Sequence, residues 1–413
     1  MRILVAMTIA CVIWPVAGAI AHEGHGLTNT PAHPGPDGES AAVDVLVAVQ
    51  DGAERAPNTK PDVPASPQGI SGQGELRFRV LYTADHLPGL AQSVIERAHG
   101  GFAVDRREGR GEIYFALPEA GILQLSRDFR LVRMLNTPAE VRKTNMHNTT
   151  IWYDADDNGY LAFPANDAAM VLTTSLDGFL KHTLGPPTSE MSFDADAVNR
   201  YFSRNGKFVP TDVEYVNGRY FITTGYSELD YVLTAEVSIT IPDPATEAAQ
   251  GRRRFRRRPS GPSVSAAWAP LAFGGRGTGP GQFGTGHGVT LPPGGSTLVV
   301  ADRPNSELDR FSLAGEYKDT VNLPEGSFPC DVDFEAGYAV VGCLHGPDRS
   351  KGAPIYILKD DKVVSTIMPK EDLGLKNFQH IHNAVLVERE GKLFIIAQAW
   401  NPGDFAILEQ VID

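Results

Sequence analysis

Residues 287–302 read HGVTLPPGGSTLVVAD: an apolar run, a turn of proline and glycine, and a second apolar run. Short runs rich in Val and Leu on either side of such a turn are typical of a β-hairpin. A histidine stands at the start of the first run, and an Ala-Asp pair ends the second. The same order of run, turn and run returns at five other places, which begin near residues 99, 147, 210, 329 and 382. From about residue 76 the chain therefore consists of six copies of one β-rich unit.

Most copies continue into further strands after the hairpin. In the copy quoted above, the run 308–312 is followed by a turn at 314–317. A hairpin followed by a third and a fourth strand is one blade of a β-propeller, and six blades close into a disc. The alternative is a β-sandwich with a similar number of strands, but a sandwich does not explain the recurring register. We predict an all-β six-bladed propeller, in which the residue before each first strand faces the mouth of a central channel.

The beginning of the chain carries the features of an export signal. Met1-Arg2 precedes an apolar run that ends at Val16, and Ala19-Ile20-Ala21 fits the small-x-small rule for cleavage. The run is too short for a transmembrane anchor. We expect a signal peptide at 1–21, a flexible Pro- and Gly-rich leader at 22–75 and the propeller at 76–413, with an insertion at about 243–282 that holds an arginine-rich solvated loop. The predicted location is the periplasm or the extracellular medium.

Charge and cysteine content restrict the function further. The net charge of −13 argues against nucleic acid as a partner, because a basic face would be needed to neutralise the phosphates. Cleavage of the signal peptide leaves two cysteines, Cys330 and Cys343. They stand at the two open ends of one predicted hairpin, and an oxidising compartment favours their pairing. We predict a disulfide between them, with two free buried thiols as the alternative.

His99 occupies the same register in the first copy, and three further copies begin with a histidine at matching positions: His147, His287 and His382. Since these belong to the second, fourth and sixth blades, a propeller would bring their imidazoles to one channel mouth. Three neutral imidazoles leave one open position on a four-coordinate zinc, as catalytic sites require, although iron, copper and nickel accept the same ligands. His380 and His99 are additional candidate ligands. The alternative is that each histidine is a core residue that makes hydrogen bonds.

The stretches Gly279–Phe283, His287–Val289 and Val300–Asn305 resemble an NHL repeat. Within that class the chain resembles peptidyl-α-hydroxyglycine α-amidating lyase, a six-bladed propeller with one zinc-binding histidine from each of three alternate blades. The resemblance implies that His147, His287 and His382 bind zinc. It also implies a catalytic tyrosine at Tyr226, which follows Gly225, and a functional arginine at Arg303.

Two positions depart from the pattern of that family. The family has a substrate-binding arginine at the end of the second strand of the first blade, where this chain has Ala116-Leu117-Pro118-Glu119. The family also has a calcium-binding aspartate after the histidine of the sixth blade, and here the residue is Asn383. An asparagine still offers a carbonyl oxygen to a structural Ca²⁺, but without the negative charge.

Two functions follow from this reasoning. The first is a metal-dependent lyase, resembling the amidating lyase, that acts on a small molecule or a peptide at the channel mouth. The second is a non-catalytic NHL propeller that binds a peptide, glycan or protein partner, with a metal that serves only the structure. The sequence does not predict an oligomeric state.

Overall fold

The computed structural model of the protein describes residues 69–241 and 262–412. The predicted signal peptide, the predicted leader up to residue 68 and the arginine-rich run lie outside the described residues. Within the described ranges, 25 strands form six sheets. The predicted all-β six-bladed propeller is therefore confirmed.

The first three blades follow the chain order without a crossover. Blade one contains β3 (Phe102–Val104), β4 (Ile113–Leu117), β5 (Gly121–Leu125) and β6 (Val132–Met134). Blade two contains β7 (Thr150–Tyr153), β8 (Gly159–Ala165), β9 (Met170–Ser175) and β10 (Leu180–Leu184). Blade three contains β11 (Asp212–Val216), β12 (Arg219–Thr223), β13 (Tyr231–Thr240) and β14 (Ser263–Gly274). The strand β14 lies within the segment predicted as an insertion and pairs with β13 from Tyr231↔Gly274 to Thr240↔Ser263.

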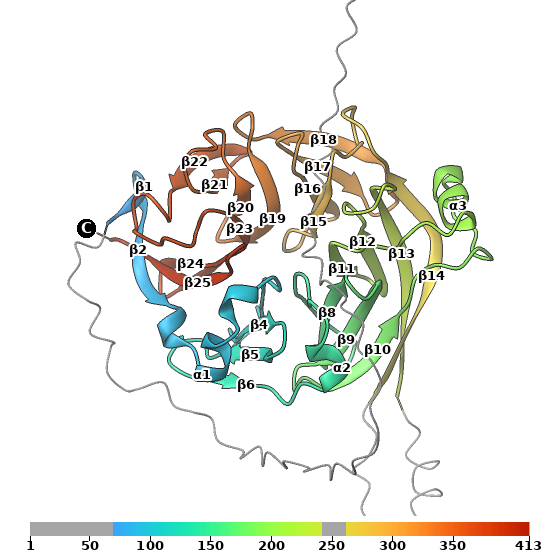
Figure 1. Cartoon of the computed structure of the whole chain (residues 1–413), viewed down its shortest axis with the longest axis horizontal. Coiled ribbons are helices and arrows are strands. Elements are labelled where there is room, and N and C mark those ends of the chain that lie inside the picture. Colours follow the sequence, from blue (N-terminus) through green and yellow to red (C-terminus); the bar gives the residue numbers. More distant parts are fainter. Residues whose placement is uncertain (1–68, 242–261, 413) are drawn as a thin grey trace, which may run out of the picture. The chain divides into compact units, whose positions relative to one another are not determined.

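The last three blades complete the ring. Blade four contains β15 (Gly286–Thr290), β16 (Thr297–Asp302), β17 (Glu307–Ser312) and β18 (Tyr317–Asn322). Blade five contains β19 (Phe328–Glu335), β20 (Tyr338–His345), β21 (Ile355–Lys359) and β22 (Lys362–Ile367). Blade six contains β23 (Ile381–Arg389), β24 (Lys392–Ala399) and β25 (Asp404–Gln410), followed in space by β2 (Leu76–Thr83) and β1 (Ser71–Gln73). Figure 1 shows the sheets around a common centre, with β11 and β15 near it and β6 and β18 at the rim.

The ring closes because the two ends of the described chain share one sheet. Strand β2 pairs antiparallel with β25, from Phe78↔Gln410 to Thr83↔Ala406. An unpaired edge on β25 would expose a row of backbone N–H and C=O groups, and β2 removes that edge. Opening the ring would therefore require the loss of this ladder as well as of the contacts between blades.

Tight turns between first and second strands set the register of the blades. Asn217 and Gly218 join β11 to β12 with φ values of 50° and 81°. Two successive residues with positive φ are the mark of the type I′ turn, whose twist matches that of a hairpin. The pairs Ala336–Gly337 and Glu390–Gly391 have the same signs of φ in blades five and six. These short turns keep the first strand of each blade next to the second.

The helices among the described residues are short and connect the blades. They are η1 (Ala84–His86), α1 (Gly89–Gln92), η2 (Ile95–Arg97), α2 (Ala139–Arg142) and α3 (Asp196–Ser203). No helix in residues 69–241 and 262–412 has the length and apolar character that crossing a membrane requires.

The hydrophobic core consists of layers between neighbouring sheets. Between blades six and one, the ring centroids of Phe115 and Phe405 lie 5.9 Å apart, and both side chains are fully buried. Burial of one such ring stabilises the fold by about 2–3 kcal/mol. Further clusters of buried aliphatic and aromatic side chains lie between the other pairs of sheets. The rigid layers hold the first strands in place around the channel.

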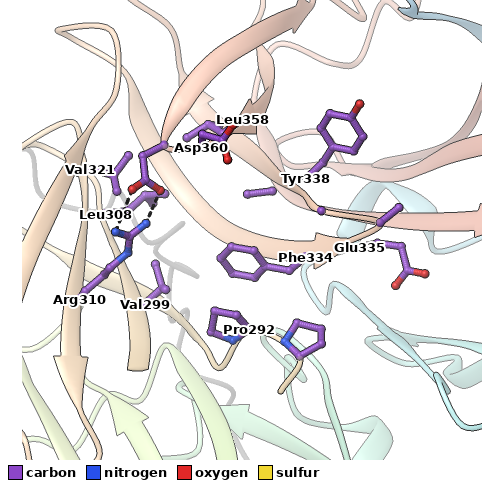
Figure 2. Close-up of a pocket in the computed structure, with 15 residues that line it drawn as sticks. Pro292, Val299, Leu308, Arg310, Val321, Phe334, Glu335, Tyr338, Leu358 and Asp360 are labelled. Carbon is purple, nitrogen blue, oxygen red and sulfur yellow. Dashed lines mark hydrogen bonds and ion pairs between the residues drawn. The ribbon is translucent and has the colours of Figure 1, made fainter. Parts of the chain in front are cut away.

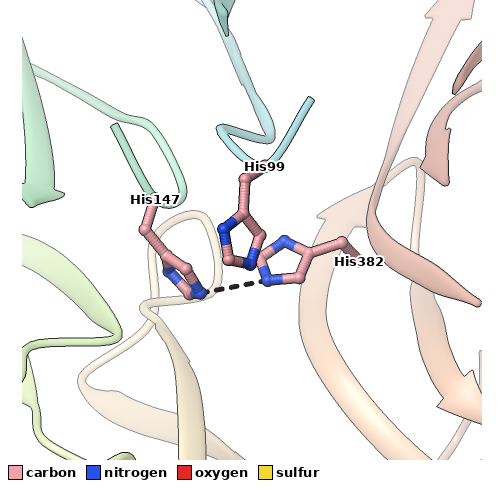
Figure 3. Close-up of side chains that lie close together, drawn as sticks. All are labelled: His99, His147 and His382. Carbon is pink, nitrogen blue, oxygen red and sulfur yellow. Dashed lines mark hydrogen bonds between the residues drawn. The ribbon is translucent and has the colours of Figure 1, made fainter. Parts of the chain in front are cut away.

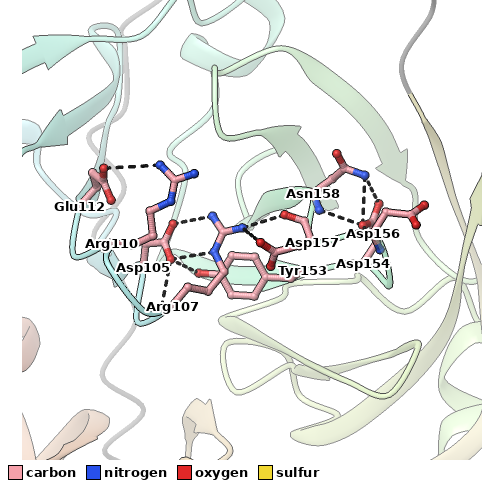
Figure 4. Close-up of polar contacts among 9 residues, drawn as sticks. All are labelled: Asp105, Arg107, Arg110, Glu112, Tyr153, Asp154, Asp156, Asp157 and Asn158. Atoms are coloured by element: carbon pink, nitrogen blue, oxygen red, sulfur yellow. Dashed lines mark hydrogen bonds and ion pairs between the residues drawn. The ribbon is translucent and has the colours of Figure 1, made fainter.

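A polar network joins blades one and two at the end of the channel that lies away from the start of the first strands (Figure 4). Buried Asp105 accepts hydrogen bonds from Arg107 Nη2 at 2.7 Å and from Tyr153 Oη at 2.9 Å. Burial alone would raise the pKa of Asp105, but the hydrogen bonds from Arg107 and Tyr153 outweigh it and lower the pKa. Arg107 also bonds the carbonyl of Asp157 in the β7–β8 turn. The network therefore fixes the two blades relative to each other.

The predicted disulfide is wrong, because Cys330 and Cys343 are separate buried thiols. Strand pairing changes register between Pro329 and Asp331, so Pro329 lies opposite Cys343 and Cys330 has no cross-strand partner. The sulfur of Cys330 accepts a hydrogen bond from Arg303 Nη2 at 3.1 Å. Cys343 instead packs with aliphatic side chains of blades four and five.

Candidate metal centre

The three predicted metal ligands lie together at the end of the channel where the first strands begin. The ring centroids of His147 and His382 are 4.5 Å apart. The ring centroid of His287 lies 4.9 Å from that of His147 and 5.0 Å from that of His382. His99 joins them, at 4.4 Å from both His147 and His382. Figure 3 shows the rings of His99, His147 and His382 converging from three separate segments. Four of the six blades thus contribute an imidazole to one cluster, which we call the histidine cluster (His99, His147, His287 and His382).

Local departures from regular strand geometry turn these side chains inward. In blade four, the pairing jumps between Gly286 and Val289, and His287 lies in the resulting bulge. In blade six, the pairing jumps between Ile381 and Asn383, so His382 occupies the same kind of bulge. A bulge leaves one residue unpaired and changes the direction of its side chain. The bulges therefore account for the inward direction of two of the four imidazoles.

His147 reaches the cluster by a different backbone device. Its neighbours Met146 and Asn148 both have positive φ, at 39° and 54°. Residues other than glycine rarely adopt this conformation, which costs on the order of 1 kcal/mol at each position. Such strain persists only where the surrounding structure maintains it, and it is frequent at functional sites.

Backbone carbonyls fix the orientation of two rings. His147 Nδ1 lies 2.5 Å from the carbonyl oxygen of Thr211, and His287 Nδ1 lies 2.6 Å from that of Cys330. A carbonyl only accepts, so Nδ1 carries the proton and Nε2 of the neutral ring keeps its lone pair, which at His287 faces the Tyr226 hydroxyl. This arrangement, in which one ring nitrogen donates to the protein and the other faces inward, is typical of metal-binding histidines.

The donor atoms fit a transition metal. His147 Nε2 and His382 Nε2 face each other at 3.0 Å, and two ligands of a tetrahedral zinc with Zn–N bonds of 2.0–2.1 Å would be about 3.3 Å apart. His382 Nδ1 is buried and has no hydrogen-bond partner in the described part of the chain. Ligand nitrogens of His99, His147 and His382 all lie within 4.8 Å of one another. His99, His147 and His382 could therefore hold a metal ion, whereas the ring of His287 lies beside them with its Nε2 at the Tyr226 hydroxyl.

Burial keeps the inner rings neutral. The pKa of His147, of His287 and of His382 is well below the ordinary value of 6.5, first because of burial and then because of nearby positive charge. Only the neutral imidazole binds a metal, so these shifts favour metal binding at neutral pH.

Tyr226 and Arg303 lie beside the histidine cluster. Tyr226 Oη is 3.0 Å from His287 Nε2 and accepts a hydrogen bond of 2.8 Å from Arg303 Nη1. Gly225 makes this approach possible, because a Cβ atom there would lie 2.4 Å from the carbonyl oxygen of Gly286. Burial raises the pKa of Tyr226, and the Arg303 guanidinium opposes the increase.

His380 and Asn383 take other roles in the structure. His380 Nδ1 bonds the carbonyl oxygen of Leu344 at 2.9 Å, and its ring packs against His345. Asn383 Oδ1 accepts from the backbone N–H of Phe102, and Nδ2 donates to Asp331 Oδ2 at 2.5 Å. The side-chain oxygen that would serve a calcium ion is thus already an acceptor for the backbone.

Two site residues escaped the sequence analysis. Cys330 occupies, in blade five, the bulge position that holds a histidine in blades four and six, and both its carbonyl and its sulfur contact the site. The alignment of Pro329-Cys330 with the histidine positions was the signal that could have revealed it. Asn148 follows His147, is buried, and has no hydrogen-bond partner for either side-chain atom among the described residues.

Two cavities lie away from the histidines. One of about 290 Å³ continues down the channel and is lined by Asp212, Glu214 and Asp331, among others. Another of about 410 Å³, between blades four and five, lies at the turns that follow the first strands (Figure 2). Its walls are mainly apolar, and its arginine, Arg310, is already paired with Asp361. These features do not suggest a catalytic role for the second cavity.

Comparison with known proteins gives limited information. No family model matches the chain. The E3 ubiquitin-protein ligases TRIM56 of Mus musculus and Homo sapiens are each 54% identical to it over 41 residues, which is 10% of this chain but only 6% and 5% of those proteins. The resemblance to an NHL repeat and to the amidating lyase therefore stays a prediction.

Several solved structures are similar over most of their length. A streptogramin B lyase has a TM-score of 0.40 and 12% identity, and covers 76% of this chain and 94% of its own. A virginiamycin B lyase from Staphylococcus aureus with quinupristin has a TM-score of 0.41 and 11% identity, covering 76% and 96%. A chain of a nidogen/laminin complex has a TM-score of 0.40 and 11% identity, covering 74% and 95%. Because these values are low, the function has to be argued from the residues of this chain.

Proposed function

We propose that this protein is an exported, divalent-metal-dependent lyase that acts on a small molecule or peptide at the histidine end of the channel. The observation that carries the proposal is the position of the Tyr226 hydroxyl, which lies between His287 Nε2 and Arg303 Nη1 beside four converging imidazoles. A structural metal needs only its ligands. An ionisable hydroxyl beside a cation and a metal-type cluster is the equipment of acid–base chemistry.

The metal-binding residues in this proposal are His147, His287 and His382, with His99 as a fourth ligand or a neighbour. Zinc is the favoured ion, since carbonyl-anchored neutral imidazoles are typical of its sites, although the same ligands suit iron, copper and nickel. A bound divalent ion would supply Lewis-acid polarisation of a substrate oxygen. We assign no role in this chemistry to calcium at Asn383, because its carbonyl oxygen is engaged with the backbone of Phe102.

Tyr226 serves as the acid–base group. In the resting state it is a neutral phenol, since burial raises its pKa. Arg303 stabilises the phenolate through the 2.8 Å hydrogen bond and through its charge, which favours the proton-accepting form. The Nε atom of Arg303 is buried without a hydrogen-bond partner in the described residues, and it can donate to an oxygen of the substrate.

The resemblance to the amidating lyase suggests a substrate with an N–C–OH carbon. In its deprotonated form, which Arg303 stabilises, Tyr226 would take the hydroxyl proton, and the carbon–oxygen bond would become a carbonyl. The C–N bond would break with its electron pair on nitrogen, and Tyr226 would return the proton to that nitrogen, so that an amide or amine and a carbonyl compound leave and Tyr226 is deprotonated again. No arginine replaces the one that the family has in blade one, and Glu119 there pairs with exposed Arg97. We therefore propose the class of reaction, and we assign no residue to bind a carboxylate group of the substrate.

Metal analysis and a lyase assay on the purified full chain test this proposal. We expect about one equivalent of a transition metal per chain by mass spectrometry, loss of that metal in His287→Ala, and glyoxylate release from an α-hydroxyglycine peptide. Absence of stoichiometric metal would overturn the enzyme proposal. Metal without glyoxylate release, with and without added zinc, would overturn the amidating-lyase substrate and leave a different N–C–OH substrate as the proposal.

The second candidate function is a non-catalytic propeller in which the metal stabilises the channel and another surface binds a peptide, glycan or protein. The burial of the cluster favours it, because His147 and His287 are both 0% exposed. The two candidate functions predict different results for Tyr226→Phe. Both predict that the variant still binds metal, but only the enzyme proposal predicts that its turnover decreases.

A further inference from the structure

A second group of possible metal ligands lies in blade four, apart from the histidine cluster. Asp302 ends β16, and Glu307 and Asp309 lie on β17; one carboxylate oxygen from each falls within 4.8 Å of the others. Asp302 pairs directly with Glu307 across the two strands, and Asp309 is two residues further along. Side chains at such positions point to the same face of a sheet. We call these three residues the blade-four carboxylates.

The blade-four carboxylates are largely buried, and few nearby groups compensate their negative charge. Asp302 and Asp309 are both 0% exposed, and Glu307 is half-buried. No lysine, arginine or histidine in the described ranges makes an ion pair with any of the three; the nearby Arg310 pairs with Asp319 and Asp361 instead. Burial raises the pKa of all three, to about 7 for Glu307 and about 6 for Asp309, and repulsion from neighbouring carboxylates adds to the increase at Glu307 and Asp309. A buried negative cluster of this kind needs protons or a cation.

One buried oxygen in the group lacks a hydrogen-bond donor in the described part of the chain. Asp302 accepts hydrogen bonds from the backbone N–H groups of Gly284 and Thr285 and from Asn305. Asp309 Oδ1 accepts from the Thr320 hydroxyl, but Asp309 Oδ2 has no partner among the described residues. A fully buried carboxylate oxygen without a donor is rare in a protein. An oxygen of Asp309 lies within 4.8 Å of one oxygen from each of the other two carboxylates, so the missing partner is something that can meet all three.

We propose that the blade-four carboxylates bind a hard divalent cation of the calcium type, at a site separate from the histidine cluster. Calcium takes six to eight oxygen ligands at 2.3–2.6 Å and accepts irregular geometry. Asp309 Oδ2 and the Glu307 carboxylate are the oxygens of the group that are open to an ion, with Asp302 beside them, and the half-buried Glu307 leaves a route for the ion and its water ligands to enter. Transition metals that prefer imidazole would occupy the histidines instead.

The bound cation would support the neighbouring catalytic residues. Asp302 holds the backbone of Gly284 and Thr285, which lead directly into the bulge of His287. Asp302 also precedes Arg303 in the chain. A cation on the blade-four carboxylates therefore stiffens the segments on which both His287 and Arg303 are carried. Its role is to position these residues, and it does not contact the reacting atoms.

The competing explanation is that the three carboxylates share protons and bind no ion. Both explanations predict that Asp309→Asn stabilises the calcium-free protein, because the change removes a negative charge and adds a donor. They differ in the response to calcium. Only the cation site predicts that calcium raises the thermal midpoint of the wild-type chain and that this rise disappears in the variant.

The test is a thermal-unfolding and calorimetric titration of the full chain, stripped with chelator, with calcium chloride as the probe. We expect one calcium per chain and a rise in midpoint of roughly 5 °C at saturating calcium, from ligand linkage. Asp309→Asn should abolish both. Glu307→Gln, at a more exposed position, should reduce the affinity for calcium at least tenfold. This second variant still tests the site if Asp309→Asn does not fold. Glu325→Gln, an exposed acidic residue on the loop after β18, is the matched control and should bind as wild type does.

A further variant separates this site from the histidine cluster. His147→Ala should leave the calcium response unchanged. No calcium response in the wild-type chain, or an equal response in Asp309→Asn and Glu307→Gln, would overturn the proposal. A calcium response that disappears in His147→Ala would also overturn it, because the ion would then lie at the histidines.

Discussion

The hydroxyl group of Tyr226 is the most direct point at which to test the proposed chemistry. Tyr226→Phe removes one oxygen and leaves the ring, so the contacts of the ring with His287 and with the Arg303 guanidinium are retained. The oxygen makes two hydrogen bonds, of 3.0 Å to His287 Nε2 and of 2.8 Å to Arg303 Nη1. Its loss therefore changes both the stability of the site and its acid–base capacity.

The two effects have different expected sizes. Arg303 is only 6% exposed, so a lost hydrogen bond to its charged group should destabilise the metal-free protein by about 1.5–3 kcal/mol. Loss of a positioned acid–base group should reduce kcat by about 10²–10⁴-fold. The KM should change little, because the ring and Arg303 remain to bind the substrate. The assay is steady-state turnover on the substrate established for the wild type, together with urea unfolding.

Tyr220→Phe provides the matched control. Tyr220 is fully buried, and its hydroxyl makes a 2.8 Å hydrogen bond to Thr173, away from the histidines. This variant should lose about 1 kcal/mol of stability and no activity. If Tyr226→Phe keeps wild-type kcat while metal remains bound, Tyr226 is not the acid–base group and the proposed chemistry is refuted. If both variants lose activity equally, the loss reflects folding alone, and the assignment fails as well.

Three further predictions follow from the structure. The pKa of each inner histidine is below the ordinary value of 6.5, so below that pH the unfolded chain binds more protons than the folded chain does. The free energy of unfolding, measured with urea, should therefore fall by up to about 1.4 kcal/mol per pH unit for each histidine as the pH decreases from 7 to 5. A free energy of unfolding that does not change over this pH range would contradict the prediction. Asp105→Asn should cost about 1.5–3 kcal/mol of unfolding free energy because it weakens the hydrogen bonds that buried Asp105 accepts from Arg107 and Tyr153, with exposed Asp156→Asn as the control, and a loss below about 0.5 kcal/mol would contradict it. Gly225→Ala places a Cβ atom 2.4 Å from the carbonyl oxygen of Gly286, so it should reduce kcat by at least tenfold while metal remains bound. Gly218→Ala, in an open turn away from the site, is the control substitution of a glycine.

The fold could be predicted because the blade hairpins repeat a local pattern. Apolar runs on either side of a Gly- or Asn-containing turn identify each hairpin, and the register of the histidines aligns one hairpin with the next. The closing strand β2 could not be found in this way. Its pairing with β25 joins residues more than 300 positions apart, and no turn near residue 76 indicates the partner.

The two cysteines show how a correct hairpin leads to a wrong pairing. From the turn at Ala336 and Gly337, β19 and β20 pair in regular steps up to Asp331 opposite Gly342. One more regular step would place Cys330 opposite Cys343, as a disulfide requires. The bulge inserts one residue at that point, so Pro329 takes the place opposite Cys343. A change of register by one residue reverses the direction of the side chain, and the sulfur of Cys330 meets Arg303 instead.

The same departure from regular pairing accounts for the site itself. Bulges occur at His287, at Cys330 and at His382, the start of the first strand in blades four, five and six. Each bulge directs a polar side chain or carbonyl toward the channel mouth, and the bulge at Cys330 supplies the carbonyl that fixes His287. Periodic patterns in the sequence predict the regular part of each blade, so they locate the channel mouth but not the direction of the groups in it. Since the bulges interrupt hydrogen bonds that a regular ladder would satisfy, their recurrence in three blades is the structural feature that the proposed ion and substrate would account for.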